Sequence, residues 1–202
     1  ELELLFSFKI IADIFLVGLP NSGKTTLLKH LTGAGVFETD YPFATKVPQL
    51  GTYRSRFREF RMCELPAIYR SSDQGRGLGT SFLKHLERAQ LIFLMLEPKS
   101  EFAENLKSGF KILRDTTERF SAKIRDGSAA FCGGNSDFSK IPYFVVINKS
   151  DLISKKEVSE LKKSFPAREQ VFFVSAKEGT GVDRLMNAAL KLLEPAHETA
   201  NQ

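Results

Sequence analysis

The chain has 202 residues, 42% of them hydrophobic, and a formal net charge of +5 at neutral pH. This length and composition suit one domain with a full hydrophobic core. Its two cysteines, Cys63 and Cys132, lack metal-type spacing, which argues against a disulfide framework or a zinc site and predicts a reducing, cytoplasmic compartment. The uncharged run 91–96 is too short to span a membrane. The basic charge favours an anionic partner such as RNA, with an ordinary basic surface as the alternative.

Short apolar runs alternate with helical patterns along the chain. The pattern predicts buried strands at 10–17, 91–96, 143–147 and 171–174, a pair of strands within 52–63, helices at 22–31, 80–89, 102–124 and 182–193, and a surface loop at 126–140. Uniformly apolar strands separated by helices indicate a parallel sheet covered on both faces. We therefore expect an open α/β fold of about six strands, mostly parallel, with one antiparallel strand from 52–63 and helices on both faces.

A glycine-bounded loop follows the first apolar run. Residues 18–25 match the phosphate-binding pattern G-x-x-x-x-G-K-[ST], and a predicted helix follows. The glycines let backbone N–H groups converge on phosphate oxygens; Lys24 would neutralise the β- and γ-phosphates, and the Thr25 hydroxyl would ligate Mg²⁺. The alternative is a glycine turn with a solvated lysine. The residues predicted to hold the nucleotide here are Gly18, Pro20, Asn21, Ser22, Gly23, Lys24, Thr25 and Thr26.

The base is predicted from Asn148-Lys149-Ser150-Asp151, which has the N-K-x-D form and follows the apolar run 143–147. The Asp151 carboxylate can accept two hydrogen bonds from guanine, whereas adenine has no donor at N1 and would leave the carboxylate unpaired. The Lys149 stem can lie along the base, and Asn148 can brace the phosphate loop. Ser175-Ala176-Lys177, after the run 171–174, fits a second base-contacting loop. Guanine nucleotides are therefore the expected ligands, although polar residues capping helices at strand ends would give similar patterns.

These motifs, with the stretches around them, resemble the G domain of the Obg family of P-loop GTPases. The resemblance covers roughly residues 9–190 and includes a first switch (D-Y-P-F-A-T at 40–45, then V-P-Q-L-G at 47–51) and a second switch region (G-R-G-L-G at 75–79, then F-L-K-H-L-E-R at 82–88). It implies a ribosome-associated GTPase that acts in large-subunit assembly or stress response, with the large ribosomal subunit or its RNA as partner. It also implies that Thr45 completes the Mg²⁺ shell and acts with Lys24 in catalysis. Asn21 occupies the position that helps to hold K⁺ in related potassium-dependent GTPases, so K⁺ dependence is a hypothesis.

The resemblance also suggests how the chain is divided. Members of the family carry a glycine-rich domain upstream of the G domain, so residues 1–9 are expected to be the end of a missing N-terminal region. Residues 10–195 would be the G domain and 196–202 a polar tail. A monomer without membrane contact is expected.

The second switch departs from the family pattern Asp-x-Pro-Gly, because this chain has Glu64-Leu65-Pro66-Ala67. Glu64 carries one extra methylene and would crowd the water through which the family's aspartate positions Mg²⁺. Ala67 keeps the backbone N–H but narrows the allowed φ and ψ. Two functions remain open: a slow Mg²⁺-dependent GTPase, or a module that senses GTP and GDP with little hydrolysis.

Other side chains have ordinary explanations. The alternation of Arg54, Arg56 and Arg58 places three guanidinium groups on one strand face, where they could meet RNA phosphates or simply be solvated. His30 and His85 are expected on helix surfaces.

Overall fold

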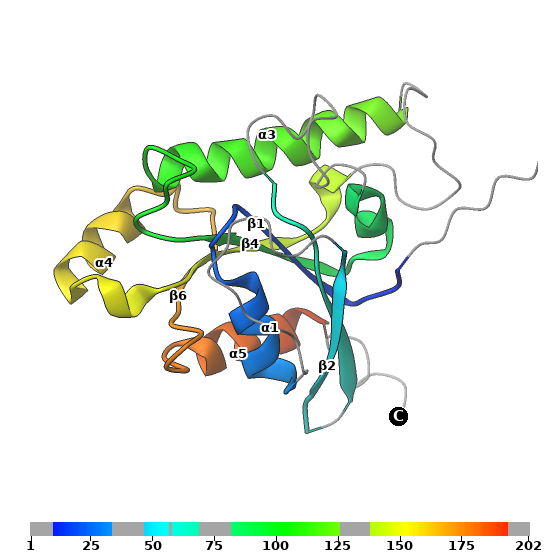
Figure 1. Ribbon diagram of the computed structural model, residues 1–202, viewed down its shortest axis with the longest axis horizontal. Coiled ribbons are helices and arrows are strands. Elements are labelled where there is room, and N and C mark those ends of the chain that lie inside the picture. Colours follow the sequence, from blue (N-terminus) through cyan, green and yellow to red (C-terminus); the bar gives the residue numbers. More distant parts are fainter. Residues whose placement is uncertain (1–9, 34–46, 57, 69–81, 126–137, 194–202) are drawn as a thin grey trace, which may run out of the picture.

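The computed structural model describes residues 10–33, 47–56, 58–68, 82–125 and 138–193. Thr45, the glycine-rich part of the second switch and most of the loop predicted at 126–140 lie outside the described residues. The described part is a twisted sheet with helices packed on both of its faces (Figure 1).

Six strands form the sheet, in the order β2-β3-β1-β4-β5-β6. Their bounds are β1 Ile14–Gly18, β2 Gln49–Arg54, β3 Glu59–Glu64, β4 Leu91–Leu96, β5 Tyr143–Ile147 and β6 Val171–Phe173. β2 pairs antiparallel with β3, and the other pairs within the sheet are parallel. The predicted six-stranded, mostly parallel sheet with one antiparallel strand is therefore confirmed.

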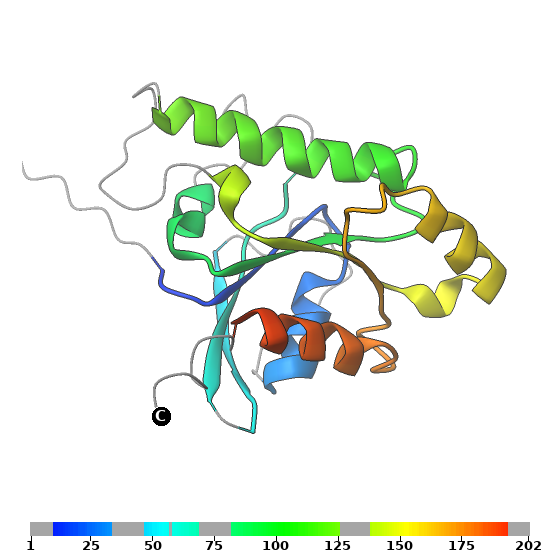
Figure 2. The same ribbon diagram turned by 180° about the vertical axis from the view of Figure 1, so that it is seen from behind.

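Helices cover both faces of this sheet. They are α1 Lys24–Thr32, α3 Leu106–Arg125, α4 Lys155–Lys163 and α5 Val182–Leu193, with short 3₁₀ helices η2 Leu83–Arg88, η3 Phe138–Lys140 and η4 Ser150–Leu152. α1 and α5 lie on one face and α3 lies on the other, as the two opposite views show (Figures 1 and 2). None of the helices in the described ranges is both long enough and apolar enough to cross a membrane.

The sheet separates two hydrophobic cores. Successive residues of a strand point to opposite faces, so Ile14 and Leu16 join the core under α1 and α5, whereas Phe15 and Val17 join the core under α3. All four side chains are fully buried. Burial of each contributes about 1.5–3 kcal/mol relative to an exposed side chain, which fixes the strand from whose end the phosphate loop departs.

Helix α4 was not expected from the sequence. Its nine residues include two apolar ones, Val158 and Leu161, which are too few for the apolar pattern on which the other helices were predicted. Its start is instead fixed by a capping box, in which the Ser154 hydroxyl accepts from the Glu157 N–H and the Glu157 carboxylate accepts from the Ser154 N–H. The S-x-x-E spacing of that box was the signal that could have revealed the helix.

The placement predicted for the arginines of 52–63 was wrong. β2 ends at Arg54, and Ser55 donates its N–H to the Arg58 carbonyl at 3.0 Å, so Arg56 lies in the turn between two strands. The Arg58 side chain lies over the Phe60 ring of β3, with its guanidinium carbon 4.3 Å from the ring centre. An antiparallel pair needs a tight turn, and the turn breaks the alternation that a single strand would have kept.

His85 was expected on a helix surface, but it is 5% exposed. Its Nδ1 accepts a hydrogen bond from the Ile10 N–H at 3.1 Å, which ties η2 to the residues just before β1. Phe138, which falls in the range predicted as a surface loop, is also buried and stacks on Phe120 of α3. Both side chains are buried by segments distant in the chain, which local patterns do not reveal.

Candidate nucleotide-binding site

The phosphate loop joins β1 to α1 through a tight backbone path that needs glycine at two positions. A Cβ on Gly18 would lie 2.5 Å from the Met95 carbonyl oxygen, and one on Gly23 would lie 2.1 Å from Nδ2 of Asn148. Gly23 also has φ +79°, and Asn21 has φ +59°, both in the left-handed region. The loop thus leads directly into the N-terminus of α1, whose backbone N–H groups favour an anion.

Lys24 opens α1 and is 5% exposed. Its ammonium donates to the carbonyls of Leu19 at 3.0 Å and Gly18 at 3.3 Å. Burial lowers the pKa of Lys24 to about 8, while the carboxylates of Glu64 and Glu97 act to raise it. The lysine therefore keeps its charge at neutral pH and stays beside the loop where phosphates are predicted to bind.

The other predicted residues of the loop lie close by. Pro20 and Ser22 are buried, and the Ser22 hydroxyl donates to the Leu19 carbonyl at 2.8 Å. Asn21 and Thr26 are half-buried. The loop is therefore held largely by its own main-chain and side-chain bonds.

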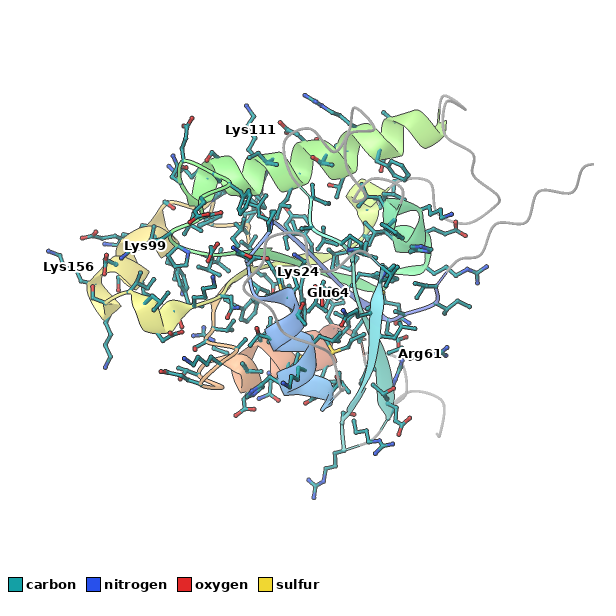
Figure 3. The ribbon with its side chains drawn as sticks, in the orientation of Figure 1. Lys24, Arg61, Glu64, Lys99, Lys111 and Lys156 are labelled. Atoms are coloured by element: carbon teal, nitrogen blue, oxygen red, sulfur yellow. The ribbon has the colours of Figure 1, made fainter. Side chains whose placement is uncertain are left out.

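Thr25 and Glu64 bring two hard oxygen ligands together. The Thr25 hydroxyl donates to Oε1 of Glu64 at 2.8 Å, and Glu64, the last residue of β3, is 1% exposed. Figure 3 shows Lys24 and Glu64 close to each other at the N-terminal end of α1. Hydroxyl and carboxylate oxygens are ligands that Mg²⁺ accepts, so the residues present fit the metal, with Glu64 in direct contact with Thr25. Thr45, the other predicted ligand, lies outside the described residues.

The start of the second switch is docked against the phosphate loop. Ile68, fully buried, donates its N–H to the Gly18 carbonyl at 3.1 Å, and Leu65 donates to the Leu16 carbonyl at 3.0 Å. Ala67 is 9% exposed and does not have a positive φ. In this conformation alanine is therefore tolerated at the position where the family has glycine.

Asn148 connects three of the predicted motifs. It is 2% exposed, its Nδ2 donates to the Ser22 carbonyl at 3.0 Å, and its Oδ1 accepts from the Ala176 N–H at 2.9 Å. One amide thus joins the phosphate loop, the N-K-x-D motif and the S-A-K loop. These segments are brought together because β1, β5 and β6 all end at the same edge of a parallel sheet.

The remaining base-motif residues lie around Asn148. Lys149 has φ +58°, and its ammonium forms an ion pair with Glu97. Asp151 in η4 is exposed, as is Lys177, whereas Ser175 is fully buried and its hydroxyl accepts from the Glu178 N–H. Asp151, predicted to read the base, is thus accessible, as is Lys177 of the second predicted base loop.

Glu97 is a charged residue of this site that was not expected from the sequence. It directly follows β4, is 8% exposed, and burial raises the pKa of its carboxyl against the opposing effect of Lys149. An acidic residue immediately after six apolar ones was the available signal. Within the described ranges, no group of three or more His, Cys, Asp or Glu side chains is arranged to hold a metal ion.

Comparison with protein families gives a match over most of the chain. The model for the 50S ribosome-binding GTPases matches residues 13–149. The chain is 30% identical over 194 residues to a protein named GTPase Obg from Elusimicrobium minutum, covering 96% of this chain and 39% of that protein. It is 34% identical over 190 residues to GTPase Obg from Amoebophilus asiaticus, covering 93% and 52%. The chain therefore spans about half the length of the curated relatives it matches, or less.

Solved structures share the fold. Era in complex with MgGDPNP and nucleotides 1506–1542 of 16S ribosomal RNA aligns with a TM-score of 0.66 at 22% identity, covering 92% of this chain and 57% of that one. NFeoB from S. thermophilus bound to GDP.AlF4- and K⁺ aligns with a TM-score of 0.60 at 22% identity, covering 90% and 62%. At this identity the likeness concerns the fold, and the fold is that of a G domain.

Proposed function

The chain belongs to the family of 50S ribosome-binding GTPases, and from that membership we propose that it binds GTP and GDP with Mg²⁺ and hydrolyses GTP slowly. The observation that carries the proposal is the pair of hydrogen bonds made by Asn148, to Ser22 on one side and to Ala176 on the other. They bring a phosphate-binding loop and two base-reading loops to one edge of the sheet. A phosphate site and a guanine site must lie in this relation for one nucleotide to occupy both.

We assign the roles as follows. Backbone N–H groups of the loop 18–25 and the Lys24 ammonium bind the phosphates, and the Asp151 carboxylate accepts from the guanine edge. Thr25 would hold Mg²⁺ directly and Glu64 would hold it through a water; the bound ion neutralises phosphate charge. Thr45 remains the proposed switch threonine that acts with Lys24. Ser175, Ala176 and Lys177 contribute a second wall of the base site.

A second candidate function is nucleotide sensing with little hydrolysis. The altered second switch favours it, because Glu64 places its carboxylate directly on the Thr25 hydroxyl. In a slow GTPase that tolerates this change, reverting it has a small effect. In a degraded catalytic site, reverting it restores turnover.

The test is single-turnover GTP hydrolysis by the wild type, Glu64→Asp, Ala67→Gly and the double variant, in K⁺ and in Na⁺ buffers. We expect measurable wild-type turnover and a change of less than about tenfold in the double variant, since charge neutralisation by Lys24 and the metal supplies most of the catalysis. A wild type that hydrolyses nothing while the double variant is active would establish the sensing function instead. Equal rates in the two buffers would remove the proposed K⁺ dependence.

The proposed specificity has a direct control. GDP and GTP should bind the wild type far more tightly than ATP, and Asp151→Ala should reduce that preference without abolishing phosphate binding. Equal affinity of the wild type for ATP and GTP would contradict guanine recognition.

The proposed biological setting is the cytoplasm, where the protein would act as a monomer on the large ribosomal subunit or its RNA, in subunit assembly or stress response. The family description and the relatives named GTPase Obg support this setting. The net charge of +5 is consistent with an RNA partner. Residues 10–195 are proposed as the G domain of a longer protein, in line with the greater length of those relatives.

A further inference from the structure

Glu97 occupies a central position in the sheet edge that carries the site. It is the residue after β4, and β4 lies between β1, which ends in the phosphate loop, and β5, which ends in the N-K-x-D motif. The backbone just before it is held, because the Leu96 carbonyl accepts from the Asn148 N–H at 2.8 Å. A side chain at position 97 is therefore held at the junction of the two motifs.

The partner of this carboxylate is the lysine of the base-reading motif. Nζ of Lys149 forms an ion pair with Oε2 of Glu97. The glutamate side chain is 8% exposed and that of the lysine is 36% exposed. The pair thus joins a buried carboxylate to a lysine side chain that is only partly exposed. Removing one partner of such a pair leaves a buried charge uncompensated, which is costly.

The backbone of Lys149 adds a second constraint. Its φ of +58° is a conformation that few residues other than glycine adopt, so the direction in which its side chain leaves the chain is already set. The long lysine stem still has several rotatable bonds, and fixing such a side chain on binding has an entropic cost. An ion pair formed before the nucleotide arrives would remove much of that cost.

We propose that Glu97 is a positioning residue that holds the Lys149 side chain in the orientation needed to lie along the guanine base. The proposal rests on the proposed function, since it concerns how the same nucleotide is bound. Glu97 does not touch the nucleotide itself, so its effect passes through Lys149. The same carboxylate also favours the charged form of Lys24 electrostatically, so the test must separate the base from the phosphates.

The experiment is a double-mutant cycle on GDP affinity with Glu97→Gln, Lys149→Met and the combination. It is run at pH 6.5, where a Lys24 of pKa about 8 is protonated. We expect Glu97→Gln to weaken GDP binding by up to about tenfold, because the Lys149 side chain would then have to be ordered when the nucleotide binds. Because Glu97 acts through Lys149, we expect the combined variant to bind no more weakly than Lys149→Met alone. Glu104→Gln, at an exposed glutamate of the same loop, is the matched control and should bind as the wild type does.

A second ligand distinguishes positioning from a general structural role. Mg²⁺-pyrophosphate carries the phosphates without a base, so its affinity should be unchanged in Glu97→Gln. Thermal unfolding of each variant is measured alongside the affinities. If Glu97→Gln does not fold, Glu97→Asp is used in its place, because it keeps the charge. The expected result for Glu97→Asp is retention of more GDP affinity than Lys149→Met retains.

Two outcomes would overturn the proposal. One is a Glu97→Gln variant that binds GDP as tightly as the wild type, and the other is an equal loss of GDP and pyrophosphate affinity. Neither bears on the proposed function, which fails separately if the wild type does not bind GDP or does not prefer it to ADP.

Discussion

At the scale of single residues, the site is a set of buried charges that compensate one another. Lys24 is 5% exposed, Glu64 is 1% exposed and Glu97 is 8% exposed. Each would be costly to bury alone, and the carboxylates support the ammonium form that desolvation opposes. This balance keeps the Lys24 ammonium at the phosphate loop. Its pKa of about 8 is nevertheless close enough to neutral pH for its protonation to change within the range in which binding can be measured.

The affinity for GDP should therefore depend on pH through Lys24. The pKa of Lys24 is lowered to about 8, so the ammonium form that attracts phosphate is present below that pH and is lost above it. We expect GDP affinity to fall as pH rises from 7 to 9, approaching about tenfold per unit at the upper end. Isothermal titration calorimetry at several pH values measures this change in GDP affinity.

The control is Lys24→Arg, whose guanidinium stays protonated throughout. Titration of the nucleotide itself affects both proteins equally, so the difference between their profiles isolates Lys24. Parallel profiles for the two proteins would contradict a lowered pKa at position 24.

At the scale of elements, the site consists of loops that leave the carboxyl ends of neighbouring parallel strands. Asn148, placed at the end of β5, is hydrogen-bonded to the loop after β1 and to the loop after β6. The strands fix where the loops begin, and the amide fixes how the loops lie relative to one another. Loss of this one side chain should therefore affect folding stability and nucleotide affinity together.

Asn148→Ala removes both bonds and leaves the Ser22 carbonyl and the Ala176 N–H without this partner. Each such buried group costs about 1–3 kcal/mol, so we expect the free energy of unfolding to fall by about 2–5 kcal/mol and GDP binding to weaken. Urea denaturation with and without GDP measures both effects. Asn187→Ala, on the exposed side of α5, is the matched control and should be nearly neutral. Equal behaviour of the two variants would show that the bridge does not stabilise the site.

At the scale of the whole molecule, two hydrophobic cores hold the sheet between α3 on one face and α1 with α5 on the other (Figure 2). This frame places the nucleotide site at one edge. A partner that contacts the loops of that edge can alter nucleotide binding without changing the frame. Switch proteins of this fold class transmit nucleotide state in this way, through loops rather than through the sheet.

The proposed ribosomal partner makes a prediction at this scale. Adding purified large ribosomal subunits should change the GTPase rate or the affinity for GTP by several-fold, and the change should weaken as salt is raised because the contact is with RNA phosphates. Small subunits serve as the comparison. Identical nucleotide affinity and turnover with and without large subunits would contradict the proposed partner.

Much of the fold was predictable because its signals are local. The four buried strands read from apolar runs are all present, and the pair expected in 52–63 is formed by β2 and β3. Helix α4 was missed because only Val158 and Leu161 of its nine residues are apolar. The arginines were misplaced because they were treated as alternating along one strand although a pair of strands was expected in 52–63; the pairing of β2 with β3 places the turn directly after Arg54.

The phosphate loop, the guanine-type motif and the mostly parallel sheet could be predicted from the residues alone, because each is a short run whose chemistry depends on its immediate neighbours. The folded chain was needed to show that Asn148 joins the loops, that Glu97 pairs with Lys149, that Glu64 contacts Thr25, and that His85 is buried beside the residues leading into β1. These contacts link residues between 28 and 126 positions apart in the chain. The contacts of Asn148, Glu97 and Glu64 exist because parallel strands bring their carboxyl ends to one edge of the sheet, whereas His85 contacts Ile10, which precedes the amino end of β1.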